Sequence, residues 1–70
     1  MEIRTEIDVK VALDSWKEMS LNAQEMRIRK AIEKLELNLM YYDQKGSGKS
    51  VERTQKCIEL LSEYHLSISK

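Results

Sequence analysis

The 70-residue sequence is poor in the residues that break or cross-link a fold. It has no proline, only two glycines and a single cysteine. One cysteine excludes a disulfide framework within the chain, and the absence of proline removes the strongest helix breaker. A chain of this length buries only about 60% of the surface of its unfolded form and is marginally stable alone. The sequence therefore predicts one small, mostly helical domain over residues 1–70 that gains stability by association.

Long hydrophobic runs and an excess of one charge are also missing. No apolar run approaches the roughly 20 residues of a transmembrane helix. The charged N-terminal residues do not fit a signal peptide. Twelve basic and twelve acidic residues give a net charge of zero, which argues against nucleic acid as the main partner. A free thiol without an export signal predicts a cytoplasmic protein that does not enter a membrane.

The N-terminal residues alternate between apolar and charged side chains. Odd-numbered positions from 3 to 13 are β-branched or apolar, and even-numbered positions from 2 to 10 are charged. This period of two predicts a half-buried β-strand over residues 2–12, followed by a short helix over 14–20. Such a strand finds little to pair with in its own chain. It would expose its backbone donors and acceptors to a second copy or to another protein.

The same segment also fits a helix. Thr5 and Asp8 could begin it. One face would then carry apolar side chains at helical spacing: Val9, Ala12, Leu13, Trp16 and Met19. The enrichment in β-branched residues favours the strand, and an all-α three-helix bundle is the alternative.

The rest of the sequence predicts a long antiparallel helical hairpin. Apolar residues recur at spacings of three and four in both halves, as on one face of a helix. We expect a helix over 22–44, a loop over 45–49 that contains both glycines, and a helix over 50–66. A loop this short makes the two helices antiparallel neighbours.

One stretch of the first hairpin helix is apolar nearly all round. Leu37, Met40 and Tyr41 lie away from its main apolar stripe, so a second surface must cover them. Together with the strand they form the predicted partner-binding set: Ile3, Ile7, Val9, Val11, Leu37, Met40 and Tyr41.

Other chemistry is weakly indicated. Lys45, Lys49 and Arg53 lie at and after the turn and could contact phosphate, although a solvated loop with helix-surface charges is the favoured explanation. Cys57 and His65 are eight residues apart and too few for a zinc site. The sequence predicts no catalytic, cofactor-binding or metal-binding residue.

Two families share parts of this pattern. A strand followed by two helices, over residues 3–34, resembles the ribbon-helix-helix repressors. The resemblance implies a dimer whose paired strands enter the DNA major groove. Three of the five charged positions on the strand are acidic, which disfavours DNA, so a repressor is the alternative function.

The hairpin over residues 28–66 resembles the small aspartyl-phosphate phosphatases of sporulating bacteria. That family has a Ser-Gln-Glu-Leu-Asp motif early in its second helix and a tyrosine ten residues after the serine. Here the segment 54–58 reads Thr-Gln-Lys-Cys-Ile, and Tyr64 follows. Gln55 matches, whereas Ile58 replaces the required aspartate. The resemblance implies a regulator of response-regulator proteins as a second alternative.

The favoured function is protein binding. We expect a small non-enzymatic regulator or adaptor that acts as a homodimer, docks on another protein and needs no cofactor.

Overall fold

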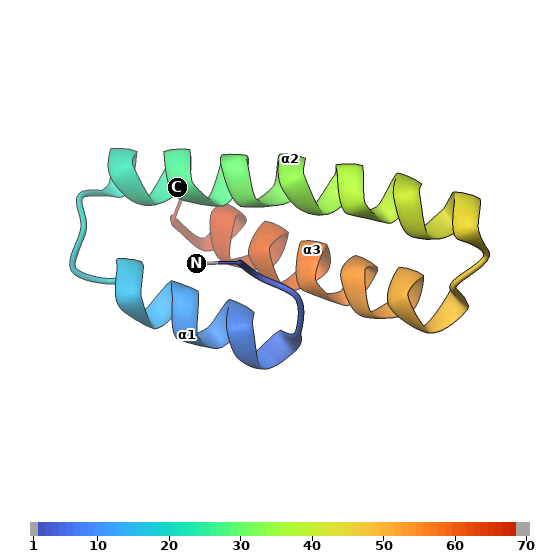
Figure 1. The fold of residues 1–70 in the computed structure, drawn as a ribbon. Helices are drawn as coiled ribbons and strands as arrows, with labels where there is room; N and C mark the ends of the chain where they lie inside the picture. The colour runs from blue at the N-terminus through green and yellow to red at the C-terminus, as the bar shows by residue number, and fades with distance from the viewer. Residues whose placement is uncertain (1, 69–70) are drawn as a thin grey trace.

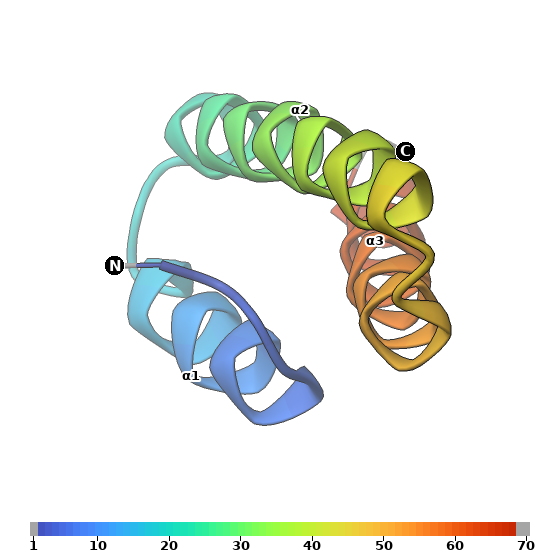
Figure 2. The same ribbon diagram turned by 45° about the vertical axis from the view of Figure 1, so that its right-hand side comes forward.

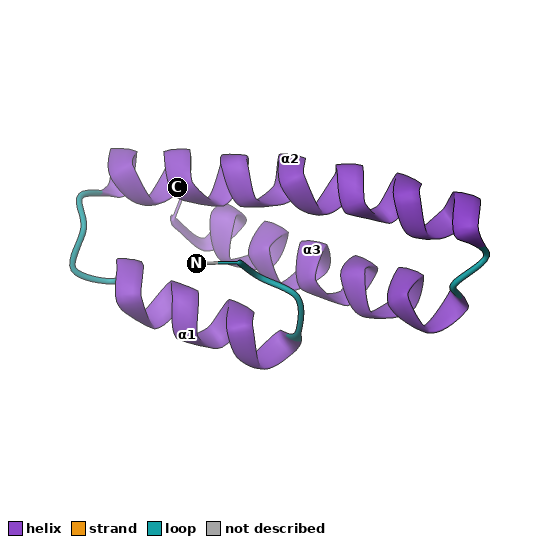
Figure 3. Cartoon of the chain, viewed as in Figure 1, coloured by secondary structure: helices purple, strands orange, loops and turns teal. Residues whose placement is uncertain are grey.

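The computed structural model describes residues 2–68, and within them it has three helices and no strand. α1 spans Glu6–Trp16, α2 spans Leu21–Lys45 and α3 spans Gly48–Ile68 (Figures 1 and 3). α2 and α3 form the predicted antiparallel hairpin (Figure 1). Residues 1, 69 and 70 of the predicted domain lie outside the described residues. The all-α alternative is confirmed for the rest.

The three helices do not close into a symmetric bundle. α1 packs mainly on α3 and scarcely touches α2. α3 therefore has a neighbour on each side, and the side between α1 and α2 is open (Figure 2). The extended segment before α1 runs along that open side (Figures 1 and 2).

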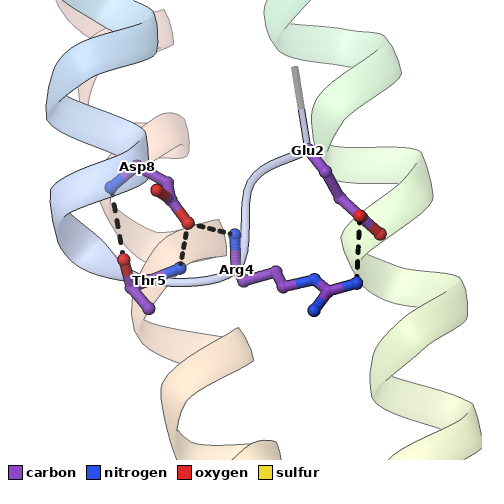
Figure 4. Close-up of polar contacts among 4 residues, drawn as sticks. All are labelled: Glu2, Arg4, Thr5 and Asp8. Carbon is purple, nitrogen blue, oxygen red and sulfur yellow. Dashed lines mark hydrogen bonds and ion pairs between the residues drawn. The ribbon is translucent and has the colours of Figure 1, made fainter.

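The predicted strand over 2–12 is wrong, because residues from Glu6 onward form α1. Thr5 and Asp8 close a capping box at its start (Figure 4). The Asp8 amide donates to Thr5 Oγ1 over 3.3 Å, and the Thr5 amide donates to Asp8 Oδ2 over 3.1 Å. These bonds satisfy amide groups that the first helical turn would otherwise leave unpaired. Helical burial of Val9 and Ala12, both fully buried, outweighs a strand preference worth at most about 1 kcal/mol.

The hairpin is defined by local signals at both ends of α2. Ser20 Oγ accepts from the Ala23 amide at the start of the helix, over 3.2 Å. Gly46 ends it in the left-handed conformation, with φ of 72°. The Ser47 amide then donates to the Tyr42 carbonyl over 3.0 Å, which gives a Schellman-type end. α3 starts at Gly48, so the chain reverses within two residues.

The core is small and lies where all three helices overlap. Seven apolar side chains are buried there: Ile3, Val9, Ala12, Ile28, Leu35, Cys57 and Leu61. One polar bridge accompanies them. Tyr64 Oη donates to Gln24 Oε1 over 2.7 Å, and Gln24 Nε2 donates to the Met19 carbonyl over 2.8 Å. This bridge fastens α3, α2 and the turn after α1 together.

The far end of the hairpin lacks a third layer. α1 has 11 residues, whereas α2 has 25 and α3 has 21. Consequently no residue from 36 to 53 is buried, on either helix or in the turn. We call this stretch, residues 36–53, the open end of the hairpin.

Candidate functional site

The open end carries an exposed apolar surface on α2. Leu37, Met40 and Tyr41 are 67%, 61% and 53% exposed. Their spacing of three and four places them on adjacent turns of one helix face. We call these three residues the α2 patch. Single exposed apolar residues are ordinary, whereas a contiguous group indicates an interaction surface.

Tyr41 is held in position within the α2 patch. Its ring meets the Tyr42 ring edge-on, with centroids 5.7 Å apart. Lys45 Nζ lies over the Tyr41 ring, 5.0 Å from the ring centroid, which is within the range of a cation–π contact. A tyrosine held in this way loses little side-chain entropy on binding, which is the property of an interface anchor.

The four predicted partner-binding residues of the N-terminal segment divide between core and surface. Ile3 and Val9 pack inside the core. Ile7 and Val11 are 71% and 51% exposed, one turn apart on α1. A strand would have placed all four on one face, but residues 6–16 are helical instead. The ribbon-helix-helix resemblance loses its structural basis for the same reason.

The predicted phosphate contacts do not converge. Lys45 is engaged over Tyr41, and Lys49 and Arg53 are exposed on the first turns of α3. Gly48-Lys49-Ser50 is the start of that helix rather than a loop. These cations provide a local positive charge and no shaped site.

A groove with a basic rim lies between α1 and α2, and the sequence analysis missed it. It encloses a cavity of about 190 Å³. Its lining combines apolar and basic side chains: Ile3, Trp16, Ala31, Leu35, Arg27, Lys30 and Lys34. The three basic residues recur at helical spacing on α2, which is a signal present in the sequence. The spacing alone does not show that these residues face a groove, because the groove exists only when residues 6–16 form a helix.

The only cysteine is a core residue. Cys57 is fully buried. Burial raises the pKa of its thiol, and the carboxylates of Glu6 and Asp8 raise it further, against a smaller opposing effect of Arg53. The thiol therefore stays protonated at neutral pH, which is the unreactive form.

The only histidine has an incomplete set of partners. His65 Nε2 is buried and forms no hydrogen bond within the described residues. Its nearest acidic atom is Glu25 Oε1 at 3.7 Å, and that oxygen already accepts from Arg29 over 2.8 Å. This contact joins α3 to the first turns of α2, near the Tyr64–Gln24 bridge.

Residues 2–68 contain neither a candidate metal site nor a helix that could cross a membrane. No group of three or more His, Cys, Asp or Glu side chains could hold a metal ion. No helix in that range is long and apolar enough to span a membrane.

Comparison with protein-family models, with curated proteins and with solved structures finds no match.

Proposed function

We propose that the protein is a non-catalytic binding module that forms a homodimer through the α2 patch and docks on another protein. The observation that carries this proposal is the open end of the hairpin, where residues 36–53 include no buried side chain. Apolar area left in water there is the main source of free energy for association.

Three further features support association between two copies. The chain is too short to bury a large core by itself. Its formal net charge is zero, so two copies do not repel each other at long range. Tyr41 is already positioned by Tyr42 and Lys45. A two-fold axis would place the α2 patch of one copy against the same patch of the other.

The absence of catalysis is supported by the state of the reactive groups. Cys57 is buried with a raised pKa, and His65 lies eight residues further along α3, beside Glu25. Ile58 replaces the aspartate that the phosphatase resemblance requires. Protein binding therefore explains more of the molecule than either alternative.

Sedimentation equilibrium tests the proposal. At about 100 μM, above the dissociation constants of most specific dimers, the wild type should have twice the monomer mass. Leu37→Glu should be monomeric, because it introduces a charge into the α2 patch.

Leu66→Glu is the matched control. Leu66 is 73% exposed on α3, outside the α2 patch, so this variant should remain dimeric. A monomeric wild type, or equal loss of the dimer in both variants, would contradict the proposal.

A further inference from the structure

The groove between α1 and α2 is already occupied in part by the chain itself. The segment before α1 runs along it, and Ile3, the one apolar residue among the described residues 2–5, is 8% exposed. Figure 4 shows Glu2 beside α2, while Thr5 and Asp8 mark the start of α1. The groove thus accepts an aliphatic side chain from an extended segment, in which the flanking residues Glu2 and Arg4 pair with each other over 3.0 Å.

Space remains in the groove beside Ile3. The cavity of about 190 Å³ is lined by Trp16, Ala31 and Leu35 in addition to Ile3. An apolar cavity of about 150 Å³ is enough to hold a molecule the size of benzene. One more leucine-sized side chain therefore fits without moving the core.

The rim of the groove is charged with one sign. Arg27, Lys30 and Lys34 line it from α2, and no acidic residue of the described chain lines it with them. None of the three forms an ion pair with an acidic side chain of residues 2–68; the ion pairs there involve other cations. An apolar floor with a row of unpaired cations is complementary to an acidic segment that carries one hydrophobic anchor.

We propose that this groove binds an acidic segment of a partner protein, which inserts one leucine-sized side chain beside Ile3 and pairs its carboxylates with Arg27, Lys30 and Lys34. The inference names the partner surface of the proposed binding function and rests on that function. Lys34 precedes Leu37 by three residues and Tyr41 by seven, so the basic rim and the α2 patch lie on the same face of α2, at different positions along its axis. The inference assigns the second protein to the part of this face beside α1, and the α2 patch lies beyond it.

Trp16 provides the readout. It is the only tryptophan of the chain and lines the groove. The probe is a capped seven-residue peptide of glutamate and serine around one central leucine. Its addition should change Trp16 emission saturably, and raising the salt from about 0.1 M to about 1 M should weaken binding, because the Debye length falls from about 10 Å to about 3 Å.

Two control peptides define the recognition. Replacing each glutamate by lysine, or the leucine by alanine, should abolish the saturable change. Equal binding of the lysine peptide would overturn the proposal, as would a response to anionic phospholipid vesicles in place of the acidic peptide.

Two protein variants locate the site. Arg27→Glu/Lys34→Glu should bind the acidic peptide at least about tenfold more weakly, the result of losing a few exposed ion pairs. Lys49→Glu/Lys56→Glu makes the same charge change on α3 and should bind like the wild type. Equal effects of the two double variants, or none in either, would overturn the assignment to the groove.

The same samples separate this inference from the homodimer. Far-UV circular dichroism shows whether each variant keeps its helices, and sedimentation shows its mass. A folded, dimeric wild type that does not bind the acidic peptide would overturn the groove assignment alone. A wild type that neither dimerises nor binds the peptide would overturn the proposed function as well.

Discussion

At the scale of single residues, Asp8 determines how the first helix begins. Its Oδ2 atom accepts from the Arg4 and Thr5 amides at 3.0 and 3.1 Å (Figure 4). These two hydrogen bonds hold the pKa of the Asp8 carboxyl below its usual range, and the bond from the Arg4 amide has the larger effect. The ionised carboxylate also lies in the first turn of α1, where the helix dipole favours negative charge.

The lowered pKa of Asp8 predicts a pH dependence of stability. A carboxyl with a lower pKa in the folded than in the unfolded state stabilises the fold above its unfolded value, near pH 4, and this contribution disappears as the pH falls through the folded value. Asp8→Asn should therefore be less stable than the wild type at pH 7, with a difference that shrinks as the pH falls below about 4. Urea unfolding at several pH values measures it.

Asp14→Asn is the control for this prediction. Asp14 is an exposed acid on the same helix, and its carboxylate contacts Lys17 Nζ over 3.8 Å instead of backbone amides, so its replacement should leave the pH profile close to that of the wild type. A difference between the wild type and Asp8→Asn that is constant with pH would contradict the role given to Asp8.

At the scale of elements, the turn between α2 and α3 depends on one glycine. Gly46 has φ of 72°, the only positive φ among the described residues. A Cβ on Gly46 or on Gly48 would meet no atom within 4 Å. The two positions therefore differ in backbone conformation, whereas both have room for a Cβ atom.

This difference predicts opposite effects of two alanine substitutions. Gly46→Ala should destabilise the fold by about 1–2 kcal/mol, because an L-residue is strained in the left-handed region. Gly48→Ala should be neutral or stabilise by up to about 1 kcal/mol, because alanine restricts the unfolded chain and suits a helix. Thermal unfolding of both variants measures the effects, and an equal loss in both would refute the account of the turn.

The hairpin and its turn could be predicted from the sequence because their signals are local. The apolar residues in α2 and α3 recur only at the helical spacing of three and four, and Gly46 can end a helix by itself. The N-terminal segment carried two periods at once, and local preference favoured the strand. Helical burial of Val9 and Ala12 against α3, together with the capping box at Thr5, decided otherwise. A contact between distant elements outweighed the intrinsic preference of the residues.

At the scale of the whole molecule, the length of α1 divides the hairpin into two halves. Where α1 is present, its residues, α3 and the first half of α2 surround the core, and the groove lies between α1 and α2. Beyond α1, the hairpin is two helices without a third layer, and the α2 patch is exposed there. The patch could be predicted from the excess of apolar residues in one helix. The groove could not, because its two walls and Ile3 come from separate segments.

The α2 patch as the dimer contact is the central claim, and one measurement tests it most directly. A sample that mixes isotope-labelled and unlabelled copies gives nuclear Overhauser effects between molecules. The claim predicts effects that join Leu37, Met40 and Tyr41 of one copy to the same three residues of the other. Intermolecular effects confined to Ile7 and Val11 of α1, or none at about 100 μM, well above typical specific dissociation constants, would contradict it.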